Sequence, residues 1–113
     1  ILYNKTAVYY TRLTVVVRCK INGVTYRLDA LLTTHAKQEG LKKYPFLPAR
    51  RGVIFIYNKD CYSSYDFSEI DYECKIFFLD SNFKLIHCES TTALQEKTVS
   101  CPDSFRYVIE ISI

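Results

Sequence analysis

Residues 105–113 read Phe-Arg-Tyr-Val-Ile-Glu-Ile-Ser-Ile, a stretch in which apolar and polar side chains largely alternate. Its apolar face consists of Phe105, Tyr107, Ile109, Ile111 and Ile113. Its polar face consists of Arg106, Glu110 and Ser112, with Val108 as the exception. A period of two residues predicts a β-strand with one buried face. We therefore expect the first four residues of the apolar face to lie in the core of a sheet.

Upstream segments predict further strands. Residues 52–57 are apolar at nearly every position, which is typical of a strand covered on both faces. Residues 13–19 and 24–32 flank Asn22-Gly23, a strong signal for a hairpin because both residues tolerate a positive φ. Residues 72–79 and 83–88 flank a second turn, at 80–82. A short strand is expected at 65–67, and the polar stretches 58–64 and 89–104 are expected to be loops.

One helix interrupts this pattern. Thr33 and Thr34 can cap a helix over residues 35–43, interrupted or ended near Gly40, and Pro45 and Pro48 prevent its continuation. Six to eight strands and one short helix predict a mainly β (α+β) fold, either a compact β-sandwich or a small barrel. A chain of 113 residues fits a single domain, 1–113.

Composition narrows the class of protein. Apolar residues make up 49% and charged residues 24%, and the net charge is +3, so a globular domain without an obligatory polyanion partner is expected. No apolar run approaches the length of a membrane helix. The five cysteines are Cys19, Cys61, Cys74, Cys88 and Cys101. An odd number without a CxxC pair favours free thiols in a reducing compartment, either the cytoplasm or a virion, with no metal and no cofactor.

Several short motifs follow one another along the chain: Thr34 with Glu39-Gly40-Leu41, residues 52–57, Tyr65-Asp66-Phe67, Ile76-Phe77-Phe78-Leu79-Asp80, Lys84-Leu85-Ile86 and Val108-Ile109-Glu110. Their order resembles that of the domain-of-unknown-function-192 family. The resemblance spans residues 15–111 and implies no established activity. Typical members carry Trp-Met-Lys-Asn-Thr and Ile-Pro-Leu-Asp where this chain has residues 66–70 and 72–75. The resemblance therefore implies that the polar site of typical members is lost or altered in this chain. Sequences that depart from the family pattern in this way resemble bacteriophage members of the family.

Catalytic chemistry finds little support in the sequence. His35 and His87 coexist with five cysteines, but His87 and Cys88 are neighbours on a predicted strand and should point to opposite faces. The hydrolase, metalloprotease and nucleotide-binding motifs are missing from the sequence. We expect no catalytic residues, and we expect the carboxylates of residues 66–73 to form a solvated edge.

Charge is distributed unevenly along the chain. Basic residues prevail between 37 and 51, where Lys37, Lys42, Lys43, Arg50 and Arg51 stand against Glu39. Acidic residues prevail between 60 and 75. Opposed charged regions favour docking to a partner or to further copies of the same chain. The expected contact surface consists of Tyr62, Tyr65, Asp66, Glu69, Asp71 and Tyr72.

Three functions follow as hypotheses. The favoured one is a non-enzymatic module that acts through protein contacts, as an accessory or virion component. The second is a small-ligand pocket at one end of the sheet. The third is weak nucleic-acid binding through the basic segment, whose cations would meet phosphates. A pocket lined by several polar groups would favour the second hypothesis.

Overall fold

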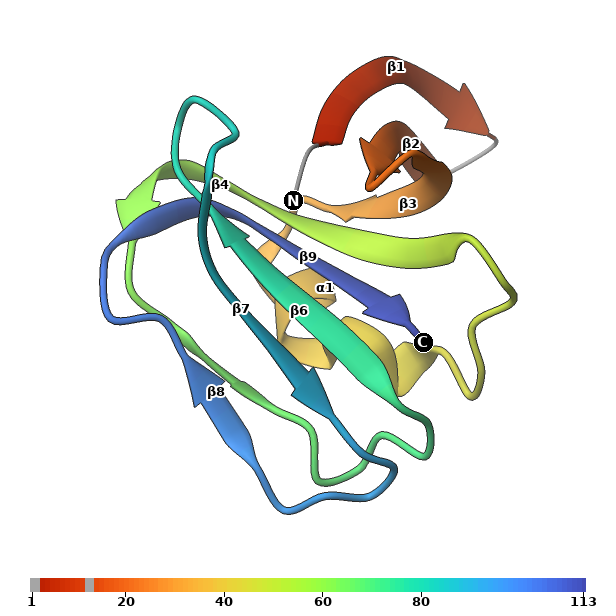
Figure 1. Ribbon diagram of the computed structural model, residues 1–113, viewed down its shortest axis with the longest axis vertical. Helices are drawn as coiled ribbons and strands as arrows, with labels where there is room; N and C mark the ends of the chain where they lie inside the picture. The colour runs from red at the N-terminus through yellow and green to blue at the C-terminus, as the bar shows by residue number, and fades with distance from the viewer. Residues whose placement is uncertain (1–2, 12–13) are drawn as a thin grey trace.

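The computed structural model describes residues 3–11 and 14–113, with side chains from residue 15 onward. A seven-stranded sheet has the order β1-β2-β3-β4-β9-β6-β7, and β5 pairs with β8 in a two-stranded sheet (Figure 1). The strands are β1 Tyr3–Thr11, β2 Thr14–Ile21, β3 Val24–Leu31, β4 Arg51–Cys61, β5 Ser64–Asp66, β6 Cys74–Leu79, β7 Leu85–Thr91, β8 Thr98–Ser100 and β9 Phe105–Ser112. The predicted mainly β class with one short helix is confirmed.

The first hairpin follows from its turn residues. Asn22 and Gly23 have φ values of 50° and 81°, and Ile21 pairs with Val24 across this two-residue turn. The predicted hairpin is therefore confirmed. Leu13, the first residue of the predicted strand, lies outside the described residues. Strand β1, which pairs with β2, was not predicted.

The helical segment connects two parallel strands. Helix α1 covers Thr34–Glu39 and the 3₁₀ helix η1 covers Gly40–Lys43, so the predicted interruption at Gly40 is confirmed. The Thr33 hydroxyl accepts a hydrogen bond of 3.1 Å from the amide of Ala36 and caps the first turn. Strands β3 and β4 pair in parallel, which requires a crossover of this kind.

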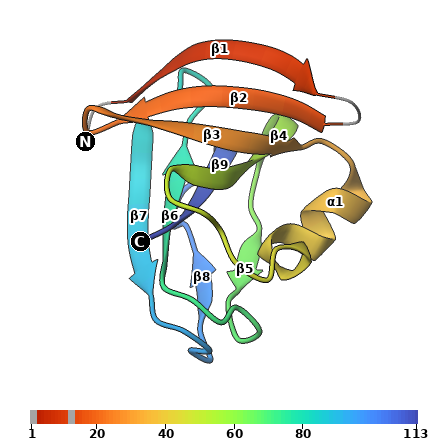
Figure 2. The same cartoon turned by 90° about the vertical axis from the view of Figure 1, so that its right-hand side faces the viewer.

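The main sheet is strongly curved and has a core on each face. Strands β1, β2 and β3 lie crosswise to β6 and β7 (Figure 2). One core lies under η1, β5 and β8 and includes Leu41, Tyr65 and Val99. The other core includes Leu28, Ile54 and residues of β6 and β9, because the curved sheet brings β2 and β3 over them.

The observed burial of side chains along β9 differs in part from the burial that alternation predicts. Both of its faces are covered, so Glu110 and Val108 are buried although they alternate with the apolar face. Tyr107 is only half-buried, and Phe105 packs in the same core as Val108. The change of face at Phe105 lies beside an irregularity in the β4–β9 register, between Ile56 and Cys61.

Two predicted loops are partly strands. Strand β4 continues to Cys61, which pairs with Phe105, so residues 58–61 are not a loop. Strand β7 extends to Thr91, and β8 pairs with β5 within the polar stretch 89–104. Val99 is 1% exposed, because β8 closes the edge of the first core. Among the described residues, no helix is long and apolar enough to cross a membrane.

Candidate ligand-binding site

A cavity of about 670 Å³ lies where the helical segment meets the end of β4, β5 and β9. Alternate residues of β4 share a face, which places Phe55 and Tyr57 together on the cavity wall. Strand β5 and the residue after it add Tyr65 and Phe67. The polar part of the lining consists of Thr34, Lys37, Gln38, Glu39, Lys42, Asn58, Ser63, Ser64, Asp66 and Glu110. The cavity has the size of an ordinary small-molecule site.

Glu110 is the buried acidic residue of this lining. It is 3% exposed, and burial alone raises the pKa of its carboxyl to about 8. Among the described residues, no hydrogen bond or ion pair engages this carboxyl group. Burial of an ionised carboxylate without a partner is costly, so the group holds its proton at neutral pH. The carboxyl is thus available to a molecule that enters the cavity.

Two tyrosine hydroxyls stand near this carboxyl. The hydroxyl oxygens of Tyr57 and Tyr65 lie 2.7 Å apart, so one hydroxyl donates to the other. Burial is the main cause that raises the pKa of both phenols, and the charge of Glu110 raises each further. Both phenols therefore stay neutral in the physiological range. The accepting hydroxyl keeps its own proton for another acceptor, since a phenol both donates and accepts.

Two lysines stand at the rim of the cavity, and each contacts another side chain. The ammonium of Lys37 lies 4.3 Å from the ring centroid of Tyr57, and desolvation lowers the pKa of this lysine. The ammonium of Lys42 lies 3.0 Å from a carboxylate oxygen of Glu69. The Lys42–Glu69 contact joins the basic segment to the acidic segment within one molecule. It therefore reduces the charge that either segment would offer to a second copy.

The expected contact surface does not assemble as predicted. Tyr65 is 8% exposed and packs in the core, which removes it from any outer surface. Tyr72 is half-buried, and its hydroxyl donates to the backbone carbonyl of Tyr44 at 3.0 Å. Asp66 accepts hydrogen bonds from the amide and hydroxyl of Ser68. These contacts give the three residues structural roles.

Asp66 is exposed, and most of the other predicted residues also remain at the surface. Tyr62 is 72% exposed, and Glu69 and Asp71, which follow it in the sequence, are exposed as well. In the basic segment, Lys42, Lys43 and Arg50 are exposed, while Lys37 and Arg51 are half-buried. The structure brings four of the predicted residues to the cavity, namely Lys37, Lys42, Tyr65 and Asp66.

The sequence pattern indicates neither Glu110 nor Tyr57 as a site residue. Alternation along residues 105–113 places Glu110 on the polar face, and residues 52–57 predict Tyr57 only as the end of an apolar strand. A signal was present nonetheless. Residues 52–57 already predicted a strand covered on both faces, and a strand beside it would have to bury its polar face as well.

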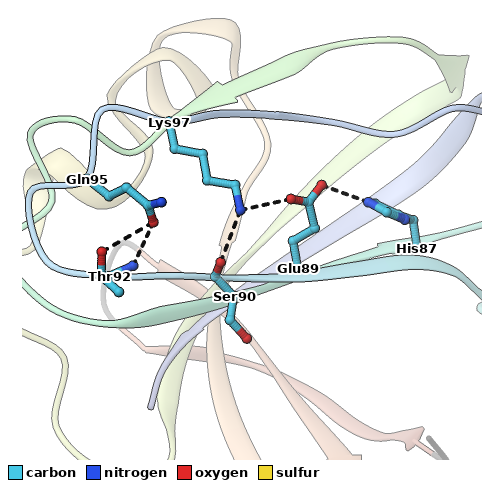
Figure 3. A network of polar contacts seen from close by, with 6 residues as sticks. All are labelled: His87, Glu89, Ser90, Thr92, Gln95 and Lys97. Carbon is cyan, nitrogen blue, oxygen red and sulfur yellow. Dashed lines mark hydrogen bonds and ion pairs between the residues drawn. The ribbon is translucent and has the colours of Figure 1, made fainter.

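A second polar cluster lies on β7 and the segment after it (Figure 3). Glu89 contacts His87 at 2.8 Å and Lys97 at 3.0 Å, and these hydrogen bonds lower the pKa of Glu89. Lys97 also donates to the Ser90 carbonyl at 3.3 Å, which ties the approach to β8 against β7. Cys88 packs against the core that contains Leu28 and Ile54, as its position next to His87 predicts. We assign this cluster to the fold.

The described residues form a small, mainly β domain with a partly buried cavity that is lined by acidic side chains, among others. The model of the domain-of-unknown-function-192 family (DUF192, described as uncharacterized ACR) matches residues 17–113, and the chain belongs to this family. The resemblance deduced from the motifs is thereby confirmed. No curated protein matches the chain in sequence.

Two solved structures show the same fold at low sequence identity. A protein of unknown function from Novosphingobium aromaticivorans superposes with a TM-score of 0.74 at 15% identity, over 95% of this chain and 81% of that one. A protein from Sinorhizobium meliloti described as a "putative transcription regulator" superposes with a TM-score of 0.68 at 14% identity, over 82% of this chain and 74% of that one. At such identities the similarity concerns the fold alone.

Proposed function

We propose that this domain is a non-enzymatic binding module for a small molecule, with its site in the cavity that contains Glu110. One observation carries the proposal, namely a buried carboxyl that has no hydrogen-bond or ion-pair partner among the described residues and lines a cavity of about 670 Å³. Native proteins rarely leave a buried polar group unsatisfied, and such groups accompany functional sites. The polar lining and the apolar rings together match the usual composition of a ligand pocket.

The lining favours binding over chemistry. Its described residues include hydroxyls, carboxyls and two lysines, but no histidine or cysteine. Tyr57 and Tyr65 have raised pKa values and would be weak bases in their neutral form. These groups are suited to hold and orient a ligand through hydrogen bonds and ring contacts.

The proposal is tested by nuclear magnetic resonance titration of the ¹⁵N-labelled domain with a fragment library. We expect hits whose shifts gather on the amides of Gly40, Phe55, Tyr57 and Glu110. The Tyr62→Ser variant is a matched control, because Tyr62 is exposed and outside the lining. It should bind the same fragments with unchanged affinity. Shifts that spread over other surfaces, or a library without hits, would refute the proposal.

Protein contact is a second candidate, favoured by the 72% exposure of Tyr62 between β4 and β5. Exposed tyrosines supply large contact area at low entropic cost. Tyr62→Ser should then lower self-association in sedimentation experiments, while Phe46→Ser, also at an exposed ring, should not. Equal behaviour of both variants would contradict this candidate. An accessory or virion role, a bacteriophage origin and nucleic-acid binding through residues 37–51 stay predictions.

A further inference from the structure

We propose that the cavity selects a small organic ammonium ion, held against the rings of Phe55, Tyr57 and Tyr65 with the Glu110 carboxylate as its counter-ion. This inference rests on the proposed ligand-binding function and names its ligand class. The cation could belong to a free amine or to a quaternary ammonium group, since both offer the same charge to the carboxylate and the rings.

The buried carboxyl supplies the first reason. Glu110 is 3% exposed and lines the cavity, and no cationic side chain described in the structure pairs with it. A buried charge is stable only when a partner of opposite sign lies beside it. A ligand cation is such a partner for the ionised carboxylate, whereas a ligand anion would be repelled by the ionised form.

The aromatic wall supplies the second reason. Phe55 and Tyr65 meet edge to face, with ring centroids 5.0 Å apart, and Tyr57 is tied to Tyr65 through its hydroxyl. Aromatic faces attract ammonium ions through the ring quadrupole, more strongly where water is excluded. The protein already uses this wall in that way, because the ammonium of Lys37 lies 4.3 Å from the centroid of Tyr57. Lys37 is therefore an internal competitor of an ammonium ligand.

The rim agrees with a cation more than with an anion. Of its two lysines, Lys42 is engaged by Glu69 at 3.0 Å, which leaves Lys37 to meet an anion. Three carboxyl groups line the same cavity, those of Glu39, Asp66 and Glu110. His35 engages Glu39 at 2.6 Å and Ser68 donates to Asp66, so among the described residues the carboxyl of Glu110 is the one of the three without a hydrogen bond or ion pair. A ligand anion would lie close to these groups, and a ligand cation would gain from them.

Cation binding and proton release are linked at Glu110. The carboxyl must ionise to act as a counter-ion, so ammonium affinity should rise about tenfold per pH unit from pH 6 towards the group's pKa of about 8, and then level off. The other titratable groups that interact with Glu110 are Tyr57, Tyr65, Tyr72 and Cys74, on β4, β5, the turn before β6 and β6. Burial raises the pKa of each, so none of them titrates in this interval.

The test compares two molecules of the same shape. Choline carries a trimethylammonium group where 3,3-dimethyl-1-butanol carries a neutral tert-butyl group. Calorimetric titration of the wild-type domain at pH 8 should show at least about tenfold tighter binding of choline. The Glu110→Gln variant should lose this preference and still bind the neutral alcohol. Lys37→Gln should bind choline more tightly, because the competing ammonium is removed.

Each contrary result has a separate meaning. Equal or tighter binding of the neutral alcohol overturns the ammonium class and leaves the ligand-binding proposal intact. A preference for choline that persists in Glu110→Gln, or weaker choline binding in Lys37→Gln, also overturns it. Wild-type affinity for choline that does not change between pH 6 and pH 8 contradicts Glu110 as counter-ion. Binding of neither molecule, together with an absence of fragment hits, refutes both proposals.

Discussion

The hydroxyl of Tyr65 lies 2.7 Å from the hydroxyl of Tyr57, and this contact joins the two-stranded sheet to the main sheet. The ring of Tyr65 also meets Phe78 and Phe105, with centroids 5.7 Å and 6.2 Å away. Tyr65 is therefore both part of the cavity wall and part of the core. Its two roles separate in experiments that remove either the hydroxyl or the ring.

Removal of the Tyr65 ring should unfold much of this region. Tyr65→Ser is expected to lower the free energy of unfolding by about 3–5 kcal/mol, because a large buried ring is lost. Tyr65→Phe should cost about 1 kcal/mol, the net value of one hydrogen bond. Urea denaturation measures both. Tyr62→Ser is the control and should stay within about 0.5 kcal/mol of wild type; a Tyr65→Ser domain as stable as this control would contradict the buried position.

Glu110 should make stability depend on pH. The folded-state pKa of about 8 exceeds the reference value of 4.5, so the folded state binds a proton that the unfolded state releases. The contribution to stability is fully present below pH 4.5 and is lost as pH rises towards 8, by about 1.4 kcal/mol per pH unit. Glu110→Gln should lack this slope and gain stability relative to wild type at pH 8. Parallel curves for the two proteins would disprove the raised pKa.

Gly52 lies where β4 and β9 approach closely. A Cβ atom at this position would lie 2.4 Å from the backbone oxygen of Glu110 and 2.8 Å from a side-chain carbon of Ile111. Gly52→Ala should therefore destabilise by about 1–3 kcal/mol or more, through overpacking between two central strands. Thermal unfolding provides the measurement. Ala49→Gly, at an exposed site before β4, is a matched control for the change in size and should have a smaller effect.

Ile111 tests the second core, the one that contains Leu28 and Ile54. It is 4% exposed and packs with Leu28 and Phe77 in the second core, so Ile111→Ala should destabilise by about 2–5 kcal/mol. Ile113, two residues further along, is 67% exposed and gives the same substitution at the surface. Ile113→Ala should change the unfolding free energy little. Similar losses at both positions would show that β9 is not anchored as described.

Local signals in the sequence account for much of the fold but little of the site. Some features depend only on residues close together in the sequence and could therefore be predicted. They are the hairpin at Asn22-Gly23, the helix start at Thr33 and the strand at 52–57. The burial of Glu110 depends on η1 and β5, which are distant in sequence and cover a face that alternation alone assigns to solvent. The exchange of faces at Phe105 likewise lies beside an irregularity in the pairing of β9 with β4, a strand distant in sequence. Neither has a local sequence signature.

The position of β9 between β4 and β6 has a consequence for synthesis on the ribosome. β9 is the last of the nine described strands to leave the exit tunnel, yet it hydrogen-bonds to both neighbours at the centre of the sheet. Until it emerges, β1–β4 and the β6–β7 hairpin are two separate pieces with exposed edges. Such edges are templates for pairing with other nascent chains. Completion of the sheet therefore waits for β9, and the interval before β9 pairs with β4 and β6 is when these two pieces are most exposed to aggregation.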